Sequence, residues 1–141
     1  FQKHTLWDRS ASAPLIISLP PSMQGEKHRG KTDAVVGLID IYPTLVDLCG
    51  LPANDKVVGR SLKPLLLDRE AAWNHPALTY MKDGARSLRT ARYRYIEYGD
   101  GSKELYDHKV DPNEWSNLAP DAEHASVLKE LEQKMSQHHI E

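Results

Sequence analysis

The chain contains very little cysteine and no long apolar run. Cys49 is its single cysteine, so no internal disulfide can form, and cysteine usage leaves the redox compartment open. No uninterrupted apolar stretch approaches the roughly 18 residues that a membrane-spanning helix needs. The first residues also lack the basic and then apolar pattern of a signal peptide. We therefore expect no membrane span, while the compartment stays unknown.

An excess of positive charge is also lacking. Eighteen Lys and Arg residues face twenty Asp and Glu residues, which gives a formal net charge of −2. A polyanion or an anionic membrane surface would meet no general attractive field. Nucleic acid is therefore not an expected partner.

No internal repeat or low-complexity tract interrupts the 141 residues, a length that suits one domain with a substantial core. The chain starts at Phe1 without an initiator methionine, and an apolar stretch follows within a few residues. We expect it to be the C-terminal part of a longer chain, whose preceding part would be its partner.

The first half of the sequence predicts alternating strands and helices. Ala13–Leu19 is short and β-branched and ends at two prolines, which favours a strand buried on both faces of a parallel sheet. Ala34–Ile39 resembles a second strand. Asp40 can cap a helix that ends near Gly50, and Ser61 can cap a short one. Such alternation is typical of α/β proteins, and we place the end of this part near residue 68.

The second half, residues 69–141, predicts an antiparallel sheet with a terminal helix. Short glycine-containing turns separate its strand-like segments, and apolar residues at helical spacing follow among Glu, Lys and Gln. The predicted strands are Ala77–Met81, Ser87–Tyr98 and Glu104–Tyr106, and the predicted amphipathic helix is Ala122–Gln137, which would cover one face of the sheet.

The N-terminal run Lys3-His4-Thr5-Leu6-Trp7-Asp8 places a cation, an imidazole and a carboxylate just before a predicted buried strand. Functional groups gather at strand ends in α/β sheets, although usually at the carboxyl end. Spacing alone leaves two interpretations open: a functional cation, or a solvated surface lysine beside a capping aspartate.

Several motifs follow in an order that resembles the sulfatase family of the alkaline-phosphatase-like superfamily, especially iduronate-2-sulfatase-like members. A lysine is followed by an aromatic residue four positions on, an acidic residue five positions on and a Pro-Leu-Ile strand, and the similarity continues over nearly the whole chain. The residues that carry it are Lys3, Trp7, Asp8, Pro14–Ile16, Val36–Leu45, Gly50–Pro52, Gly59–Leu66, Ser87–Ile96, Glu104–Asp107, Asp111–Glu114 and Asn117–Ala119.

This resemblance implies a C-terminal portion of a mixed-sheet α/β fold and a catalytic role for Lys3, which would contact a sulfate oxygen of the substrate. The family uses a formylglycine nucleophile, made from a cysteine in a C-x-P-S-R motif, and a calcium ion. Both would belong to the part that precedes this chain, so we expect residues 1–141 alone to be inactive. The implied substrate is a sulfated small molecule or carbohydrate, and the implied compartment is periplasmic or secreted.

Three further residues are weaker candidates for substrate binding: His4, beside Lys3, and Arg86 and Arg89, which could border the pocket. Cys49 is not a candidate nucleophile, because Pro52 lies one place too late for the motif and no arginine follows. We expect Cys49 to be a small core residue. No metal ligand is assigned, because the aspartates of the first half are too widely spaced for a calcium loop.

Arginines and tyrosines alternate between Arg86 and Tyr98, which could indicate a nucleic-acid surface. Period-2 alternation instead places Arg92 and Arg94 on one face with Ile96, and Tyr93 and Tyr95 on the other. We therefore interpret this segment as a structural strand with packed tyrosines beside a solvated edge.

Two other functions stay open. The whole protein could be a phosphodiesterase or phosphonate hydrolase of the same superfamily, because a lysine stabilises a phosphoryl group as well as a sulfuryl group. The chain could also be an independent, non-catalytic binding module that presents Arg and Tyr to a sulfated or acidic ligand. A cooperative melt of the isolated chain would favour the module.

Overall fold

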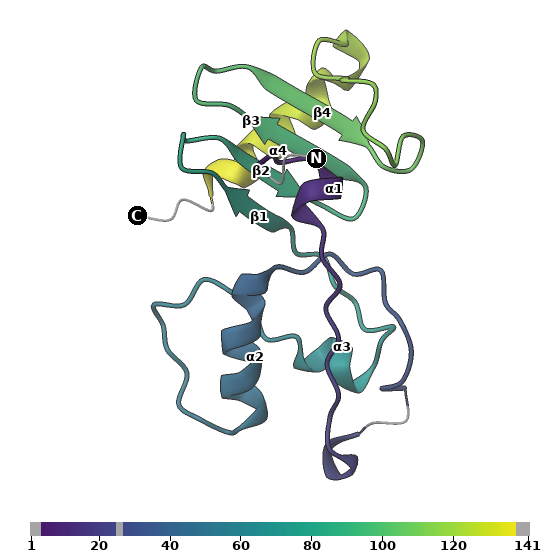
Figure 1. Ribbon diagram of the computed structural model, residues 1–141, viewed down its shortest axis with the longest axis vertical. Coiled ribbons are helices and arrows are strands. Elements are labelled where there is room, and N and C mark those ends of the chain that lie inside the picture. The colour runs from purple at the N-terminus through teal and green to yellow at the C-terminus, as the bar shows by residue number, and fades with distance from the viewer. Residues whose placement is uncertain (1–3, 25–26, 138–141) are drawn as a thin grey trace. The chain divides into compact units, whose positions relative to one another are not determined.

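The computed structural model describes residues 4–24 and 27–137 (Figure 1). The chain forms two compact units, one from Leu15–His75 and one that joins residues 1–14 to residues 76–141. The first fourteen residues therefore belong with the C-terminal half, a return that the sequence did not predict. The domain boundary near residue 68, which the change in strand and helix pattern predicted, stays a prediction. Within the described residues, no helix is long and apolar enough to cross a membrane.

The C-terminal unit is built on a four-stranded antiparallel sheet of order β1-β2-β3-β4. Its connections are short, and the turns predicted at Gly84 and Gly101 are present with φ values of +86° and +84°. Glycine reaches this left-handed region without steric cost. The strands are β1 Ala77–Tyr80, β2 Arg86–Arg89, β3 Tyr93–Glu97 and β4 Lys103–Asp107.

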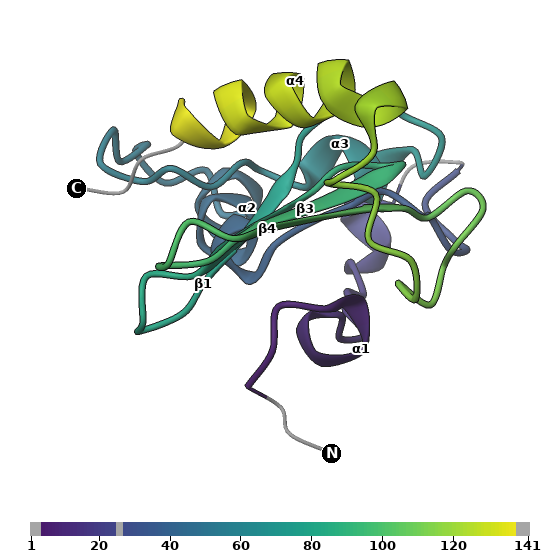
Figure 2. The same cartoon turned by 90° about the horizontal axis from the view of Figure 1, so that it is seen from above.

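One face of this sheet is covered by the terminal helix α4 (Ala125–Ser136), which a short 3₁₀ turn at Ala122–His124 precedes. Leu88, Tyr95 and Leu105 stand opposite one another on β2, β3 and β4, and all three are fully buried. Leu131 and Met135 of α4 pack on this row (Figure 2). The predicted amphipathic helix and its role are confirmed.

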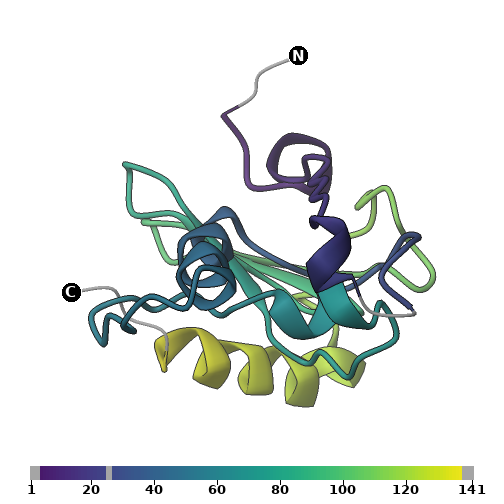
Figure 3. The same cartoon turned by 90° about the horizontal axis from the view of Figure 1, so that it is seen from below.

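The opposite face carries the N-terminal segment and the short helix α1 (Asp8–Ala11). Figures 2 and 3 show this segment and α4 on opposite sides of the sheet. Leu6 is buried among Ala85, Ile96 and Tyr106, so the apolar part of this face is closed by a residue from the start of the chain.

The predicted separation of Tyr95 from Ile96 is confirmed, because they lie in different clusters. The prediction is wrong for Arg92, which lies in the turn before β3 with its guanidinium over the Tyr93 ring (4.8 Å to the ring centre), and the solvated edge is wrong for Arg94, which is buried.

The predicted single strand Ser87–Tyr98 is wrong, because the chain turns back at Thr90–Arg92 to make β2 and β3. Tyr93 donates its backbone N–H to the Thr90 hydroxyl (2.9 Å), and the Thr90 N–H donates to the Tyr93 carbonyl (2.8 Å). A threonine hydroxyl thus closes the turn in place of the glycine or asparagine that sequence rules look for.

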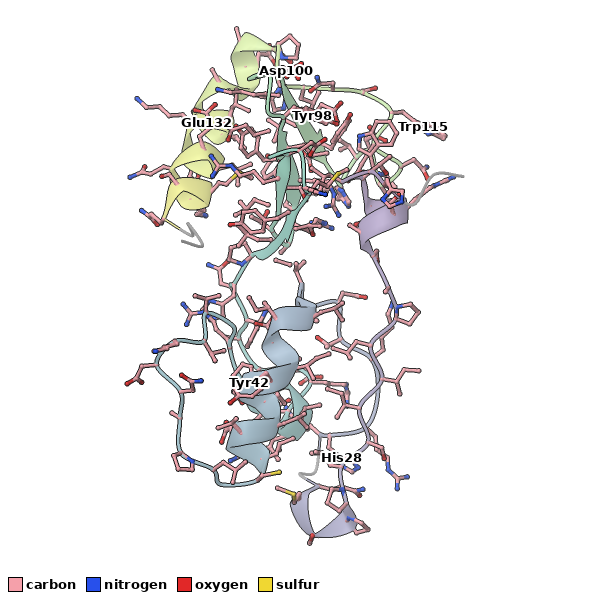
Figure 4. All side chains as sticks on the ribbon, turned by 60° about the vertical axis from the view of Figure 1, so that its left-hand side comes forward. His28, Tyr42, Tyr98, Asp100, Trp115 and Glu132 are labelled. Carbon is pink, nitrogen blue, oxygen red and sulfur yellow. The ribbon has the colours of Figure 1, made fainter. Side chains whose placement is uncertain are left out.

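The loop after β4 lies along the outer edge of the sheet. The Leu105 N–H donates to the Asn117 side chain (3.0 Å), and the Leu118 N–H donates to the Leu105 carbonyl (2.9 Å). Asp111 accepts the Trp115 N–H (2.7 Å) in the same loop, while the Trp115 ring is exposed (Figure 4). The quoted C-terminal motifs therefore hold this loop against β4.

The unit Leu15–His75 contains two α-helices and two short 3₁₀ turns. The predicted helices are present, although the second starts at Lys63 with Leu62, not Ser61, at its N-cap position. The Ser61 hydroxyl accepts the Lys63 N–H (3.2 Å). The elements are η1 Pro21–Met23, η2 Leu38–Asp40, α2 Ile41–Leu48 and α3 Lys63–Leu67.

The segments Gly37–Thr44 and Arg60–Leu62 of this unit are joined by hydrogen bonds between backbone N–H groups and side chains. The sequence predicted that Asp40 caps α2, and Asp40 does stand at the N-cap position, but its side chain makes no capping bond to the helix. Its carboxylate instead accepts the Gly37 and Arg60 N–H groups (2.8 Å each). The buried Thr44 hydroxyl donates to the Asp40 carbonyl (2.5 Å) and accepts the Leu62 N–H (2.8 Å). These segments therefore serve the architecture of the unit.

Replacing Thr44 by Val should lower the local free energy of unfolding by about 1–3 kcal/mol, because the shape is kept while the buried Leu62 N–H loses its acceptor. Native-state hydrogen exchange of the α3 amides measures this loss. Thr44→Ser is the matched control, since it keeps the hydroxyl. Equal stability of the Val and Ser variants would contradict the assigned role.

Both predicted strands of this unit are wrong. Ala13–Leu19 and Ala34–Gly37 carry no strand, and Ile16 is 90% exposed. β-branched composition favours an extended chain, but a strand exists only when a partner supplies hydrogen bonds. The pairing found among the described residues of this unit is one isolated bridge between Lys27 and Asp68.

The prediction that Cys49 is a core residue is also wrong, because Cys49 is exposed. Cys49 shares a face of α2 with Tyr42 and Leu45, at helical spacing, and both of these side chains are more than half exposed (Figure 4 labels Tyr42). The buried residue of α2 is Thr44. The sequence identified the apolar positions of the helix correctly but not which of its sides is covered within the unit.

Candidate functional site

The structure places the four candidate residues from the sequence in different surroundings. Lys3 lies outside the described residues, and His4, which follows it, is exposed. The Arg86 guanidinium pairs with Glu97 (Nη2 to Oε2, 3.0 Å). Arg89 reaches the N-terminal segment, with its Nε 3.7 Å from the Asp8 carboxylate. The functional roles of these four residues stay predictions.

Arg94 is the centre of a buried charged cluster on the face of the sheet that carries the N-terminal segment. It stands on β3, and its side chain is 3% exposed. Its Nη1 donates to the Leu6 carbonyl (3.0 Å), its Nη2 to the Asp8 carboxylate (2.7 Å) and its Nε to Glu114 (2.6 Å). One guanidinium thus joins the N-terminal segment to the loop after β4, through hydrogen bonds that are charge-assisted.

Glu114 is the second centre of the cluster, and its side chain is 3% exposed. Besides Arg94, its carboxylate accepts the Asp8 N–H (2.7 Å) and lies 2.6 Å from Nε2 of His108. Its φ of +59° is the one positive value among the described residues other than glycine. A non-glycine residue keeps this conformation only where its surroundings over-determine it, so these contacts fix one backbone geometry.

Asp8 neutralises two arginines that would otherwise repel each other. Arg89 and Arg94 stand directly opposite on β2 and β3, where like charges destabilise a sheet. The Asp8 carboxylate lies beside both, at 3.7 Å from Arg89 and 2.7 Å from Arg94. Burial, together with the nearby Arg94 charge, lowers the pKa of Arg89. The N-terminal segment therefore supplies a negative charge that offsets the repulsion between the two arginines on this face of the sheet.

Two further contacts hold the same segment. Trp7 donates its indole N–H to Glu104 (2.8 Å), which also accepts the Tyr106 hydroxyl (3.0 Å). Burial raises the pKa of Tyr106, with the Glu104 charge acting in the same direction, so the phenol stays a donor. Arg9 donates to the Asn113 side chain (3.0 Å).

Asp8, His108 and Glu114 could in principle hold a metal ion, because one ligand atom from each lies within 4.8 Å of the others. Calcium requires six to eight oxygen ligands, whereas this group offers two carboxylates and a nitrogen. Arg94 already donates to both carboxylates. The cluster does not fit a calcium site, and its charge is balanced by arginine.

Sequence reasoning missed this cluster. It placed Arg94 on the same face as Ile96, and an arginine beside an apolar residue on an inward face is the signal that could have indicated burial. Glu114 appeared only as part of the Asp111–Glu114 motif, and nothing local marked His108 as its neighbour. The cluster depends on contacts such as that of Arg94 with Asp8, which are 86 positions apart.

Asp107 should make the stability of this unit dependent on acid. The Arg92 guanidinium, which donates to both of its carboxylate oxygens (3.0 and 2.6 Å), and the Lys109 N–H lower the pKa of this buried carboxyl. A lowered folded-state pKa stabilises the fold above the ordinary value near 3.8, and this stabilisation is lost as the pH falls through the folded-state value.

We expect Asp107→Asn to cost about 1–2 kcal/mol near neutral pH, because Arg92 is half-exposed and its pairing is partly screened. The cost should be smaller in strong acid, below the lowered folded-state pKa, because the unaltered carboxyl is protonated there and its pairing with Arg92 is already lost. Urea unfolding at both pH values measures the difference. A cost that is the same at both would contradict the ion-pair assignment.

The whole chain, residues 1–141, matches the protein family described as N-sulphoglucosamine sulphohydrolase, C-terminal. A curated sulfatase of Formosa agariphila is 36% identical over 131 residues, which cover 93% of this chain and 25% of that protein. The chain thus spans about a quarter of the length of this relative.

Solved structures show the same similarity. A protein solved in complex with its substrate D-glucosamine-2-N,6-O-disulfate superposes with a TM-score of 0.61 and 31% identity, over 70% of this chain and 22% of that one. The phosphonate monoester hydrolase of Agrobacterium radiobacter superposes with a TM-score of 0.56 and 26% identity, over 70% of this chain and 23% of that one. The predicted fold class is confirmed.

Proposed function

Because this chain belongs to the sulfatase family as its C-terminal portion, we propose that the whole protein hydrolyses a sulfate ester of a carbohydrate. The reaction consumes water and yields the free alcohol and sulfate. The family match over all 141 residues carries the proposal. The neighbour solved with a disulfated glucosamine supports a sulfated sugar as the substrate class.

In the proposed reaction, Lys3 contacts a sulfate oxygen and offsets the negative charge that develops around sulfur. An ammonium on a flexible stem acts as a compact point charge with three donors, so its contribution is electrostatic. His4, exposed beside it, and Arg89 would border the same substrate. Arg86 is the weaker candidate, since its guanidinium is already paired with Glu97.

The remainder of the whole protein is proposed to supply the formylglycine nucleophile and calcium. When present, these groups provide a covalent route to sulfuryl transfer and a cation beside the sulfate. The buried cluster around Arg94 does not suit calcium, so the chain's own acidic residues Asp8 and Glu114 are assigned to the fold.

The test is an assay of the purified whole protein against a sulfated glucosamine and against a phosphonate monoester. We expect sulfate release from the first substrate and much slower turnover of the second. Residues 1–141 alone should release no sulfate and serve as the control. Faster turnover of the phosphonate would favour the second candidate function, which the similarity to the phosphonate monoester hydrolase keeps in view.

A further inference from the structure

Helix α2 and the turn η2 that runs directly into it carry an uncovered apolar stripe. Its residues follow one another at intervals of four, three and four positions, the spacing of one helical face, and are Leu38, Tyr42, Leu45 and Cys49. Leu38 is 76% exposed, Tyr42 and Leu45 are more than half exposed, and Cys49 is exposed at the end of the helix (Figure 4 labels Tyr42). We call these four residues the α2 stripe.

The polar groups of α2, in contrast, are satisfied within the unit Leu15–His75. Thr44 is buried and exchanges hydrogen bonds with the Asp40 carbonyl and the Leu62 N–H. Asp47, the one charged residue of α2, pairs with Lys63 (Oδ1 to Nζ, 2.8 Å). The unit thus covers a polar side of its helix and leaves an uncharged, apolar side in contact with water.

Other apolar residues of the same unit are uncovered as well. Ile16 is 90% exposed, and among the described residues no hydrogen bond between backbone groups involves Leu15–Ser18. Leu51 and Val58 are 58% and 64% exposed. Single exposed apolar residues are ordinary, whereas a row of neighbouring ones on one helix face marks an interaction surface.

We propose that the α2 stripe is the surface on which the portion of the whole protein outside residues 1–141 packs. The chain matches a C-terminal family portion and spans 25% of the Formosa agariphila sulfatase, so about three quarters of such a protein is available as a cover. A portion of the same polypeptide is tethered, which gives it an effective concentration that a separate partner lacks. An uncharged stripe suits this occupant, because permanent interfaces are more apolar than transient ones.

The first test measures how fast iodoacetamide alkylates Cys49 in the native whole protein. Peptide mass spectrometry distinguishes Cys49 from any other thiol, and the same protein unfolded in urea gives the rate of a fully exposed thiol. We expect alkylation to be about 100-fold slower in the native protein, because a covered thiol reacts only when the contact opens. Alkylation close to the unfolded rate would overturn the proposal.

A second copy of the protein is the other occupant that this experiment separates. Protection by a tethered portion does not depend on concentration, whereas protection by self-association falls as the protein is diluted. Protection of Cys49 that persists on dilution supports the proposal. Loss of protection on dilution would overturn it in favour of a dimer.

The second test replaces Leu45 in the whole protein. We expect Leu45→Asp to lower the melting temperature by about 5 °C or more and to speed the alkylation of Cys49, because an unpaired carboxylate would be buried in an apolar contact. Leu45→Met is the matched control, since it keeps the volume and the apolar character, and it should change neither measurement. Equal melting temperatures for the two variants would overturn the proposal.

These measurements stay decisive if Leu45→Asp does not fold, because the alkylation of Cys49 in the unaltered protein needs no variant. They are also independent of the proposed function. A protected Cys49 in a whole protein that releases no sulfate would leave the α2 stripe as an interface and overturn only the sulfatase proposal.

Discussion

We expect the whole protein carrying Lys3→Ala to hydrolyse its sulfate ester about 10²–10³-fold more slowly, which is the size of effect seen when one donor to a developing oxyanion is removed. The reason is electrostatic: in the proposed reaction, the charge that builds up on the sulfuryl oxygens would lose the stabilising Lys3 ammonium. Because that interaction strengthens in the transition state, the loss should appear mainly in kcat.

Lys82→Ala is the control for this experiment, since Lys82 is an exposed lysine in the turn between β1 and β2. Its removal should leave the rate unchanged. Lys3→Arg should give an intermediate loss, because a planar guanidinium keeps the charge but cannot reproduce the compact ammonium. Undiminished turnover by Lys3→Ala would remove the lysine from the mechanism.

The largest expected effect on stability is that of Arg94→Met. Removing one partner of a buried ion pair leaves the other charge buried and unpaired, which costs about 3–5 kcal/mol. Glu114 would lose its arginine partner and keep the Asp8 N–H, and the Leu6 carbonyl would lose the hydrogen bond from Arg94. Native-state hydrogen exchange of the β3 amides in the whole protein measures the local loss.

The double variant Arg94→Met with Glu114→Gln tests the cause of that loss. It removes both charges of the pair, so its loss of unfolding free energy should be well below the sum of the losses of the two single variants. Glutamine keeps the length of the side chain and still accepts the Asp8 N–H. Strict additivity of the two changes would show that the pair does not act as a unit.

The C-terminal half could be predicted from sequence because its signals are local. Period-2 alternation placed Tyr95 and Ile96 on different faces, and glycines marked the turns at Gly84 and Gly101. The exception was the turn at Thr90, where the threonine hydroxyl accepts the Tyr93 N–H and closes a turn that contains no glycine or asparagine. Local chemistry without a characteristic residue is hard to recognise in a single sequence.

The first half was predicted less well because a strand forms only with a partner strand that can lie far away in the sequence. Ala13–Leu19 has the composition of a buried strand, but composition supplies no partner. Burial of Arg94 could not be inferred for the same reason: alternation gives its face, whereas its acceptors at Leu6 and Asp8 come from the other end of the unit. The hydrogen bonds from the Arg60 N–H to Asp40 and from the Leu62 N–H to Thr44, 20 and 18 positions apart, were not inferred for the same reason.

The division of the C-terminal unit into two pieces has a consequence for how the chain folds during synthesis. Leu15–His75 is complete before β3 has been made, so its short-range contacts can form first. The Leu6–Asp8 segment must wait, because its partners Arg94 and Glu114 are translated 86 and 106 positions after Asp8. Closing so long a loop is slow and costly in entropy. The Leu6–Asp8 segment therefore takes its final place late, after β3 and the loop that follows β4 have been made.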